Sequence, residues 1–233
     1  MADGKKLKVL SAGAVKGGVA QLGEEFERAT GQGLTIDFAP APVLRDRIAA
    51  GETADVLILP ESVMDAAVAH GKVAAASRAY LGRSRVGVAV HAQAPAMDLS
   101  DTEAFKRALL GASAVVYNDA SSGVYVAQLL EKLGLTSRLA SRIGVVRSGA
   151  AIMEYVAEHP PAAVGLAQIS EIMVLIAKGC PVRFAGPLPD AIQNSTTYFA
   201  AVPMQGAAPA AGAFVNFLVT SAAQATFAAS GID

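Results

Sequence analysis

Short apolar runs alternate with longer amphipathic stretches along the 233-residue chain. Compact apolar runs bounded by glycine, proline or polar residues predict strands, whereas apolar residues three or four positions apart predict helices. The predicted strands are 6–11, 34–38, 55–59, 84–90, 114–117, 143–146, 163–167, 182–185 and 197–202. The predicted helices are 19–29, 43–50, 62–69, 102–110, 123–133, 150–158 and 210–229. Strands that alternate with helices in this way favour βαβ units around a mainly parallel sheet, and therefore an α/β fold.

The ends of these elements carry further signals. The helix predicted after the first strand has Val19, Leu22 and Phe26 at helical spacing, and Gly31 follows its last turn. Between that strand and that helix, residues 13–18 are rich in glycine and predict a turn. Near the C-terminus, residues 206–212 are rich in Ala, Gly and Pro, which predicts a loop leading into the final helix.

The strand–helix units fall into two sets of similar size, with no long polar linker between them. This arrangement predicts two lobes that the chain crosses twice, near 82–85 and near 194–197. The first lobe is predicted to combine residues 1–83 with 196–233, and the second to comprise residues 84–195. Each lobe is expected to hold a mixed, mainly parallel sheet, with a ligand cleft between the lobes.

Composition and charge exclude several classes of partner. The formal net charge is −1, and no basic block or stripe is present, so the sequence gives no footprint for nucleic acid. Hydrophobic residues make up 53% of the chain, yet no apolar run approaches the roughly 18 residues that a membrane span needs. We therefore expect a small-molecule partner, and neither nucleic-acid binding nor membrane insertion.

Metal and cofactor chemistry is not expected either. Cys180 is the only cysteine, so no internal disulfide and no cysteine-based zinc site can form. The three histidines, His70, His91 and His159, lack the close spacing of a metal-binding pair. The first residues lead directly into a strand without the apolar core of a signal peptide. This predicts a cytoplasmic protein, or a periplasmic one if a signal peptide has been removed.

Residues after the first strand are the first candidate ligand site. In open α/β sheets, ligands bind beyond the carboxyl ends of the strands, where helix N-termini offer free N–H groups. Ser11, Gly13, Ala14 and Lys16 occupy that position after the first predicted strand. Gly13 allows the backbone to approach a ligand closely, although a tight strand-to-helix turn explains the same glycine.

Three further segments occupy the same kind of position in the second half. Asp119, Ser121, Ser122, Gly123 and Tyr125 follow one strand and lead into a helix. Two serines before glycine, with a phenol nearby, indicate an oxyanion cradle, whereas a single serine would be an ordinary helix cap. The remaining segments are Arg147 to Ala150, where Arg147 offers a charge for a carboxylate, and Gln168, which ends a strand with an amide.

These segments together give the chain a family resemblance. The stretches that carry it are 8–15, 38–51, 54–58, 121–125, 130–134 and 164–168, in order and with matching spacing over almost the full length. The chain resembles the molybdate-binding proteins of ABC importers, within the type II periplasmic binding fold. The resemblance implies a two-lobed α/β fold that holds a small anion, with an ABC permease as partner if the protein is exported.

The sequence departs from this family at the ligand positions. The family's first binding serine falls at Ala14, its serine run after the second strand falls at 40–42 (Pro40, Ala41 and Pro42), and its binding tyrosine falls at Gln168. Its backbone donor falls near Gly149, beside Ala150. A tetrahedral oxyanion needs many directional donors, and proline has no N–H to give. We therefore expect a small organic carboxylate, whose apolar part faces Ala14 and 40–42. Its oxygens would face Ser11, Ser121, Ser122, Arg147 and Gln168.

Two functions remain open from the sequence. The first is a solute-binding protein that closes over its anion. The second is a cytoplasmic, cofactor-free isomerase, tautomerase or lyase of a small unsaturated carboxylate on the same fold. Such an enzyme needs a base, for which Lys16, Asp119 and Tyr125 are the candidates. No phosphate-binding loop or Ser-His-Asp arrangement is evident.

Overall fold

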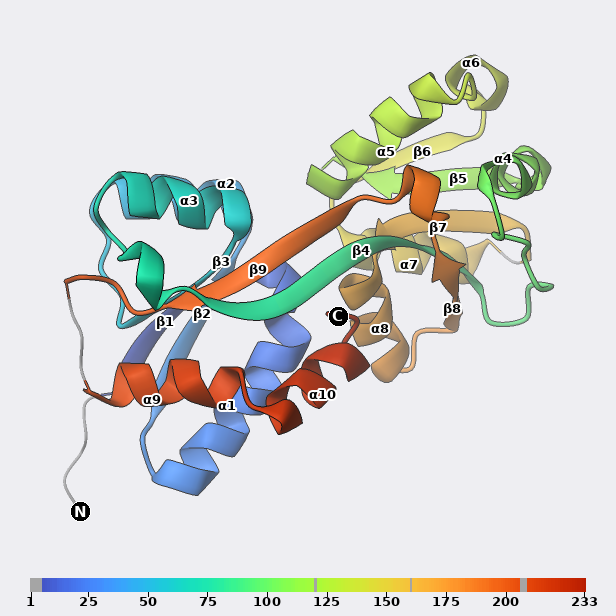
Figure 1. The fold of residues 1–233 in the computed structure, drawn as a ribbon. Coiled ribbons are helices and arrows are strands. Elements are labelled where there is room, and N and C mark those ends of the chain that lie inside the picture. Colours follow the sequence, from blue (N-terminus) through green and yellow to red (C-terminus); the bar gives the residue numbers. More distant parts are fainter. Residues whose placement is uncertain (1–5, 120, 160, 206–208) are drawn as a thin grey trace. The chain divides into compact units, whose positions relative to one another are not determined.

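The chain forms two structural units. A computed structural model describes residues 6–119, 121–159, 161–205 and 209–233. Unit 1 comprises residues up to Ser84 together with Thr196–Asp233, and unit 2 comprises Arg85–Ser195. Two strands, β4 (Ala79–His91) and β9 (Ser195–Ala201), contain the points where the chain passes from one unit to the other (Figure 1).

Unit 1 is a mixed sheet with helices on both faces. Its strands β1 (Leu7–Ala12), β2 (Leu34–Ala39) and β3 (Val56–Pro60) are parallel in the order β2-β1-β3, and β9 pairs antiparallel with β3. Figure 1 shows one group of helices on each face of this sheet. One group is α2 (Ala41–Ala49) and α3 (Glu61–Ala69); the other is α1 (Lys16–Thr30), α9 (Pro209–Leu218) and α10 (Ser221–Ala229).

Unit 2 repeats this design and its strand order, with one additional strand. Its strands are β4, β5 (Ala114–Asn118), β6 (Ile143–Val146), β7 (Ala163–Gln168) and β8 (Val182–Pro187). Strand β5 pairs in parallel with β6 and β7, whereas β4 pairs antiparallel with β7 and β8. The helices are α4 (Thr102–Gly111), α5 (Ser121–Lys132), α6 (Thr136–Leu139), α7 (Gly149–Glu158) and α8 (Ile169–Ala177). The expected mixed α/β architecture is therefore present.

The unit-2 sheet is buried on both faces because its strands are apolar at consecutive positions. Val115 packs in a core with Phe105 and Leu130, whereas its neighbour Val116 packs in a second core with Ile152. Side chains alternate across a strand, so neighbouring residues must face opposite sides of the sheet. Uninterrupted apolar strands of this kind are typical of parallel sheets covered by helices on both faces.

Two local predictions were wrong. Residues 16–18 begin helix α1 and do not complete a turn, because Gly18 lies against the ring of Phe227 in α10, where a larger residue would not fit. The predicted helix 210–229 is two helices, bent by 61°, because the Thr220 hydroxyl accepts the Ala223 N–H and starts a new helix. Residues 206–208 of the predicted loop lie outside the described residues.

Helices α6 and α8 were not predicted, and α8 is the longer of the two. Its sequence, Ile-Ser-Glu-Ile-Met-Val-Leu-Ile-Ala, is apolar at nearly every position, so it shows little helical periodicity. The helix is nevertheless stable because it packs against α7 and β8 of the same unit. Within the described part of the chain no single helix is long and apolar enough to cross a membrane, although α9 and α10 together meet those criteria as a bent pair.

Candidate ligand-binding site

The predicted ligand residues of unit 1 gather at one edge of its sheet. Strands β1 and β2 run in parallel register, with Ser11 opposite Phe38 and Ala12 opposite Ala39, so their carboxyl ends coincide. A Cβ atom on Gly13 would lie 3.9 Å from the Ala39 carbonyl oxygen, which shows how closely the two segments approach. This edge therefore carries Ser11, Gly13, Ala14, Pro40, Ala41 and Pro42.

Few side-chain donors are available at this edge. Ser11 is fully buried, and its hydroxyl donates to the Ala12 carbonyl oxygen at 3.2 Å. Helix α2 begins after Pro40, which gives no side-chain cap, and Pro42 in its first turn has no N–H. Lys16, a predicted base, is exposed, and its ammonium lies 5.5 Å from the centre of the Phe38 ring. The edge is suited to an apolar group more than to a multiply charged oxyanion.

Unit 2 presents its predicted residues at the shared carboxyl edge of β5, β6 and β7. At the end of β5, Ser122 is buried, and its hydroxyl donates to the Asn118 side-chain oxygen at 3.4 Å. Gly123 packs so closely on the end of this strand that a Cβ atom would lie 1.5 Å from the Asn118 carbonyl oxygen. Only glycine allows this seating of the first turn of α5. Ser121 begins the helix, and the position of its side chain lies outside the described structure.

Two of the predicted bases lie beside this turn. Tyr125 is half-buried, and its hydroxyl donates to the Ile192 carbonyl oxygen at 2.8 Å. Desolvation raises the pKa of this phenol. Asp119 is exposed, and its backbone N–H donates to the Val146 carbonyl oxygen at 3.0 Å, which ties the end of β5 to the end of β6. The hydrogen bond to Ile192 gives Tyr125 a structural role within unit 2.

Arg147 provides a free cation at the same edge. It is exposed, and its guanidinium makes no hydrogen bond or ion pair with the described residues. The next residue, Ser148, caps α7 by accepting the Ala151 N–H at 3.1 Å, and Gly149 and Ala150 form the first turn. The positive end of the helix dipole therefore adds to the charge of Arg147.

The end of β7 carries a buried acid that sequence reasoning missed. The Gln168 side-chain oxygen is buried and has no hydrogen-bond partner among the described residues, and the same holds for Oε2 of Glu171, in the first turn of α8. Oε2 would lie 2.5 Å from a Cβ atom on Gly149, so the carboxyl group rests directly on the start of α7. Two elements thus enclose it.

Burial also affects the titration of this acid. Desolvation raises the pKa of Glu171, and a hydrogen bond from the Gln168 backbone only partly opposes the shift. An unpartnered buried acceptor costs about 1–3 kcal/mol, so such a group calls for an explanation. The sequence did hold one signal for it, because Glu171 is the only charged residue of 169–177.

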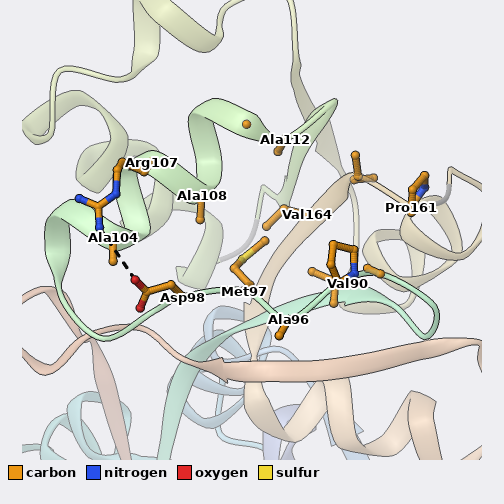
Figure 2. A pocket seen from close by; sticks show the side chains of 15 residues that line it. Val90, Ala96, Met97, Asp98, Ala104, Arg107, Ala108, Ala112, Pro161 and Val164 are labelled. Carbon is orange, nitrogen blue, oxygen red and sulfur yellow. Dashed lines mark ion pairs between the residues drawn. The ribbon is translucent and has the colours of Figure 1, made fainter.

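An apolar cavity of unit 2 lies elsewhere. It has a volume of about 430 Å³ and is bordered by Ala163 and Val164, at the opposite end of β7 from Gln168. Figure 2 shows that it is mainly apolar, with Met97 and Ala108 on its walls and the Arg107–Asp98 ion pair of 3.9 Å at one side. None of the predicted ligand residues borders this cavity.

Metal-binding groups are sparse in the described residues. No group of three or more His, Cys, Asp or Glu side chains comes together there. Cys180 is half-buried, and burial raises the pKa of its thiol, with the negative charge of Glu154 adding to the shift. A raised pKa disfavours the reactive thiolate.

Comparison with known proteins places the chain in a family. Residues 7–233 match the family model of the bacterial extracellular solute-binding proteins. The chain belongs to this family. Its sequence is 33% identical over 236 residues to an aconitate isomerase from a Pseudomonas species, an alignment that covers 97% of this chain and 87% of the relative.

Solved structures agree on the fold. The periplasmic molybdate-binding protein of Azotobacter vinelandii superposes with a TM-score of 0.75 at 20% identity, covering 98% of this chain and 99% of that one. The sulfate-binding protein SubI of Mycobacterium tuberculosis superposes with a TM-score of 0.73 at 18% identity, covering 98% and 86%. The resemblance to molybdate-binding proteins of the type II periplasmic fold is thereby confirmed. At these identities the likeness concerns the fold and not the ligand.

Proposed function

We propose that this chain binds a small organic anion with several carboxylate groups, and that it isomerises an unsaturated one of the aconitate type. The observation that carries the proposal is the exposed guanidinium of Arg147, which pairs with none of the described residues and lies directly before the N-terminus of α7. Ser122, in the first turn of α5, and Gln168, the last residue of β7, belong to neighbouring segments of the same sheet edge. A planar guanidinium beside a helix N-terminus is well matched to a carboxylate.

Unit 1 supports an organic ligand over a tetrahedral oxyanion. Ala14, Pro40 and Pro42 offer no side-chain hydroxyl, and Pro42 has no N–H. An oxyanion such as molybdate loses its water on every side and needs a donor for each oxygen. A carboxylate ligand needs donors only at its charged groups, so its carbon skeleton can lie against alanine and proline.

The isomerase part of the proposal is supported by the relative that is 33% identical over most of both chains and is named an aconitate isomerase. Moving a double bond to the adjacent carbon pair requires only that one proton leaves one carbon and that one returns to another. That chemistry needs a positioned acid–base group and no cofactor. The solute-binding part is supported by the family, for which a periplasmic location and a membrane permease would be the matching context.

A thermal-shift experiment tests the ligand class. Purified protein would be heated with cis- or trans-aconitate, other di- and tricarboxylates, molybdate, tungstate or sulfate. A ligand present at about 100 times its dissociation constant stabilises the native state by about 2.7 kcal/mol. We expect aconitate to raise the melting temperature and molybdate to leave it unchanged. The opposite pattern would refute the carboxylate proposal.

Substitution of Arg147 tests the proposed carboxylate contact. Arg147→Met removes the charge but keeps an unbranched side chain, and the loss of a charge-assisted hydrogen bond costs about 1.5–3 kcal/mol. The dissociation constant for aconitate should therefore rise about 10- to 100-fold. The matched control is Arg138→Met, since Arg138 is also exposed but lies on α6, before β6 and not after it. Equal effects of the two substitutions on calorimetric titrations would contradict the assignment.

A further inference from the structure

We propose that Glu171 is the catalytic acid–base residue that carries the proton in this isomerisation, with Gln168 orienting the same part of the ligand. This inference rests on the proposed function. Neither residue has been assigned a catalytic role by the sequence pattern, in which the candidate bases were Lys16, Asp119 and Tyr125.

The position of Glu171 is the first argument. It lies in the first turn of α8, directly after the carboxyl end of β7. Its carboxyl group rests on Gly149, at the start of α7, where a Cβ atom would lie 2.5 Å from Oε2 and 2.6 Å from Cδ. The acid therefore lies between the first turns of α7 and α8, the helices that follow β6 and β7. Gly149, which it contacts, comes two residues after Arg147.

The unused hydrogen-bonding capacity of this pair is the second argument. Oε2 of Glu171 and the side-chain oxygen of Gln168 are both buried, and neither has a partner among the described residues. Most buried polar groups in folded proteins are paired, so an unpaired carboxyl and an unpaired amide three residues apart indicate a site that a ligand completes. Burial also raises the pKa of Glu171. A carboxyl group whose pKa lies nearer to neutrality can both accept and return a proton.

The other candidate bases are less suited to this step. The Tyr125 hydroxyl is engaged with the Ile192 carbonyl oxygen, and its pKa is raised from an already high value. Asp119 is exposed to solvent, where proton transfer is not protected from water. Lys16 belongs to unit 1, where its ammonium lies over the Phe38 ring. Glu171 combines burial, a free oxygen and a position at the predicted sheet edge.

The proposed step balances without a further reactant. The ionised Glu171 carboxylate takes a proton from the methylene carbon of aconitate, and the electron pair of that C–H bond spreads over the three-carbon allylic system and its carboxylates. The protonated carboxyl then returns a proton to the other terminal carbon, and the double bond forms between the other carbon pair. The new double bond keeps the conformation that the former single bond had when the proton left, so the product can be the opposite geometric isomer. Arg147 and the positive end of α7 would stabilise the added negative charge.

Proton NMR in deuterated water tests the assignment. The full chain would be incubated with trans-aconitate, and both the appearance of cis-aconitate and deuterium at the methylene position would be followed. Three variants would be compared: Glu171→Gln, Glu171→Asp and, as the control, Glu131→Gln, which removes an exposed carboxylate from α5. Positioned acid–base groups contribute about 100- to 10,000-fold to rate. We expect Glu171→Gln to lose at least 100-fold in isomerisation and deuterium exchange while aconitate still raises its melting temperature.

The outcomes distinguish a failure of this inference from a failure of the proposed function on which it rests. If wild-type protein converts aconitate and Glu171→Gln converts it equally fast, the assignment of Glu171 is wrong and the proposed function stands. If wild-type protein neither converts nor exchanges aconitate, the isomerase function and the assignment fall together. Should Glu171→Gln fail to fold, Glu171→Asp decides: it keeps the acid but withdraws it by more than 1 Å, and we expect about a 100-fold loss in turnover. Unchanged turnover in Glu171→Asp would overturn the assignment.

Discussion

The seating of α5 on the end of β5 makes Gly123→Ala a severe perturbation. The added methyl group would lie 1.5 Å from the Asn118 carbonyl oxygen and 2.7 Å from the Asn118 side-chain oxygen. Carbon and oxygen in contact lie about 3.5 Å apart, so the first turn of the helix must retreat by about 2 Å. Asn118 is itself 2% exposed and cannot move outward without disturbing the sheet.

The magnitude follows from two opposing effects. Overpacking a tight contact costs about 1–3 kcal/mol, and occasionally more. Alanine in place of glycine in a helix returns about 0.5–1 kcal/mol. We therefore expect Gly123→Ala to lower the free energy of unfolding by about 1–2 kcal/mol or more. Because the displaced turn carries Ser122, the affinity for aconitate should fall as well.

A glycine in the same unit supplies the control. Gly111 ends helix α4, and a Cβ atom there would meet nothing within 4 Å. Gly111→Ala should therefore leave stability unchanged or raise it by up to about 1 kcal/mol. Urea denaturation followed by circular dichroism would measure both variants, and their thermal midpoints should differ by about 5 °C or more. Gly123→Ala as stable as Gly111→Ala would refute the close seating of α5 on Asn118.

Two further predictions concern pH. Because burial raises the pKa of Glu171, its contribution to stability is complete below its ordinary value of 4.5 and is lost as pH rises through the folded-state value. Glu171→Gln should thus make thermal midpoints less dependent on pH from 4.5 upward, and an unchanged slope would contradict the burial of the acid. Glu52 behaves oppositely: hydrogen bonds from Arg47 and Lys8 lower its pKa from 4.5 to about 2. Its contribution is present above pH 4.5 and lost as pH falls towards 2, so Glu52→Gln should flatten the acid side of the same melting profile. If wild type and Glu52→Gln had identical melting profiles at acid pH, the ion pairs of Glu52 with Arg47 and Lys8 would not persist in solution.

Most of the strand–helix order could be predicted from local pattern. Strands such as 34–38 and 143–146 are short apolar runs with turn signals at both ends, and β2 and β6 lie where those runs lie. Helix boundaries could be predicted less well. The glycines at 17 and 18 favour a turn by propensity, yet they lie in the first turn of α1. Gly18 leaves the space that the ring of Phe227 occupies, and Phe227 is more than 200 residues further along the chain. A contact at that distance in sequence leaves no local signal.

The candidate site shows the same contrast between local sequence signals and long-range packing. The α/β class, the resemblance to anion-binding proteins and the segments that follow the strands could be read from the residues alone, because strand ends and helix starts are encoded by neighbouring residues. The parallel register of β5, β6 and β7 then brings the segments after Asn118, Val146 and Gln168 to one edge. Which of their side chains are available to a ligand depends on packing between distant segments. Arg147 pairs with none of the described residues and Glu171 is buried against Gly149, and both facts depend on how helices distant in sequence pack around that edge.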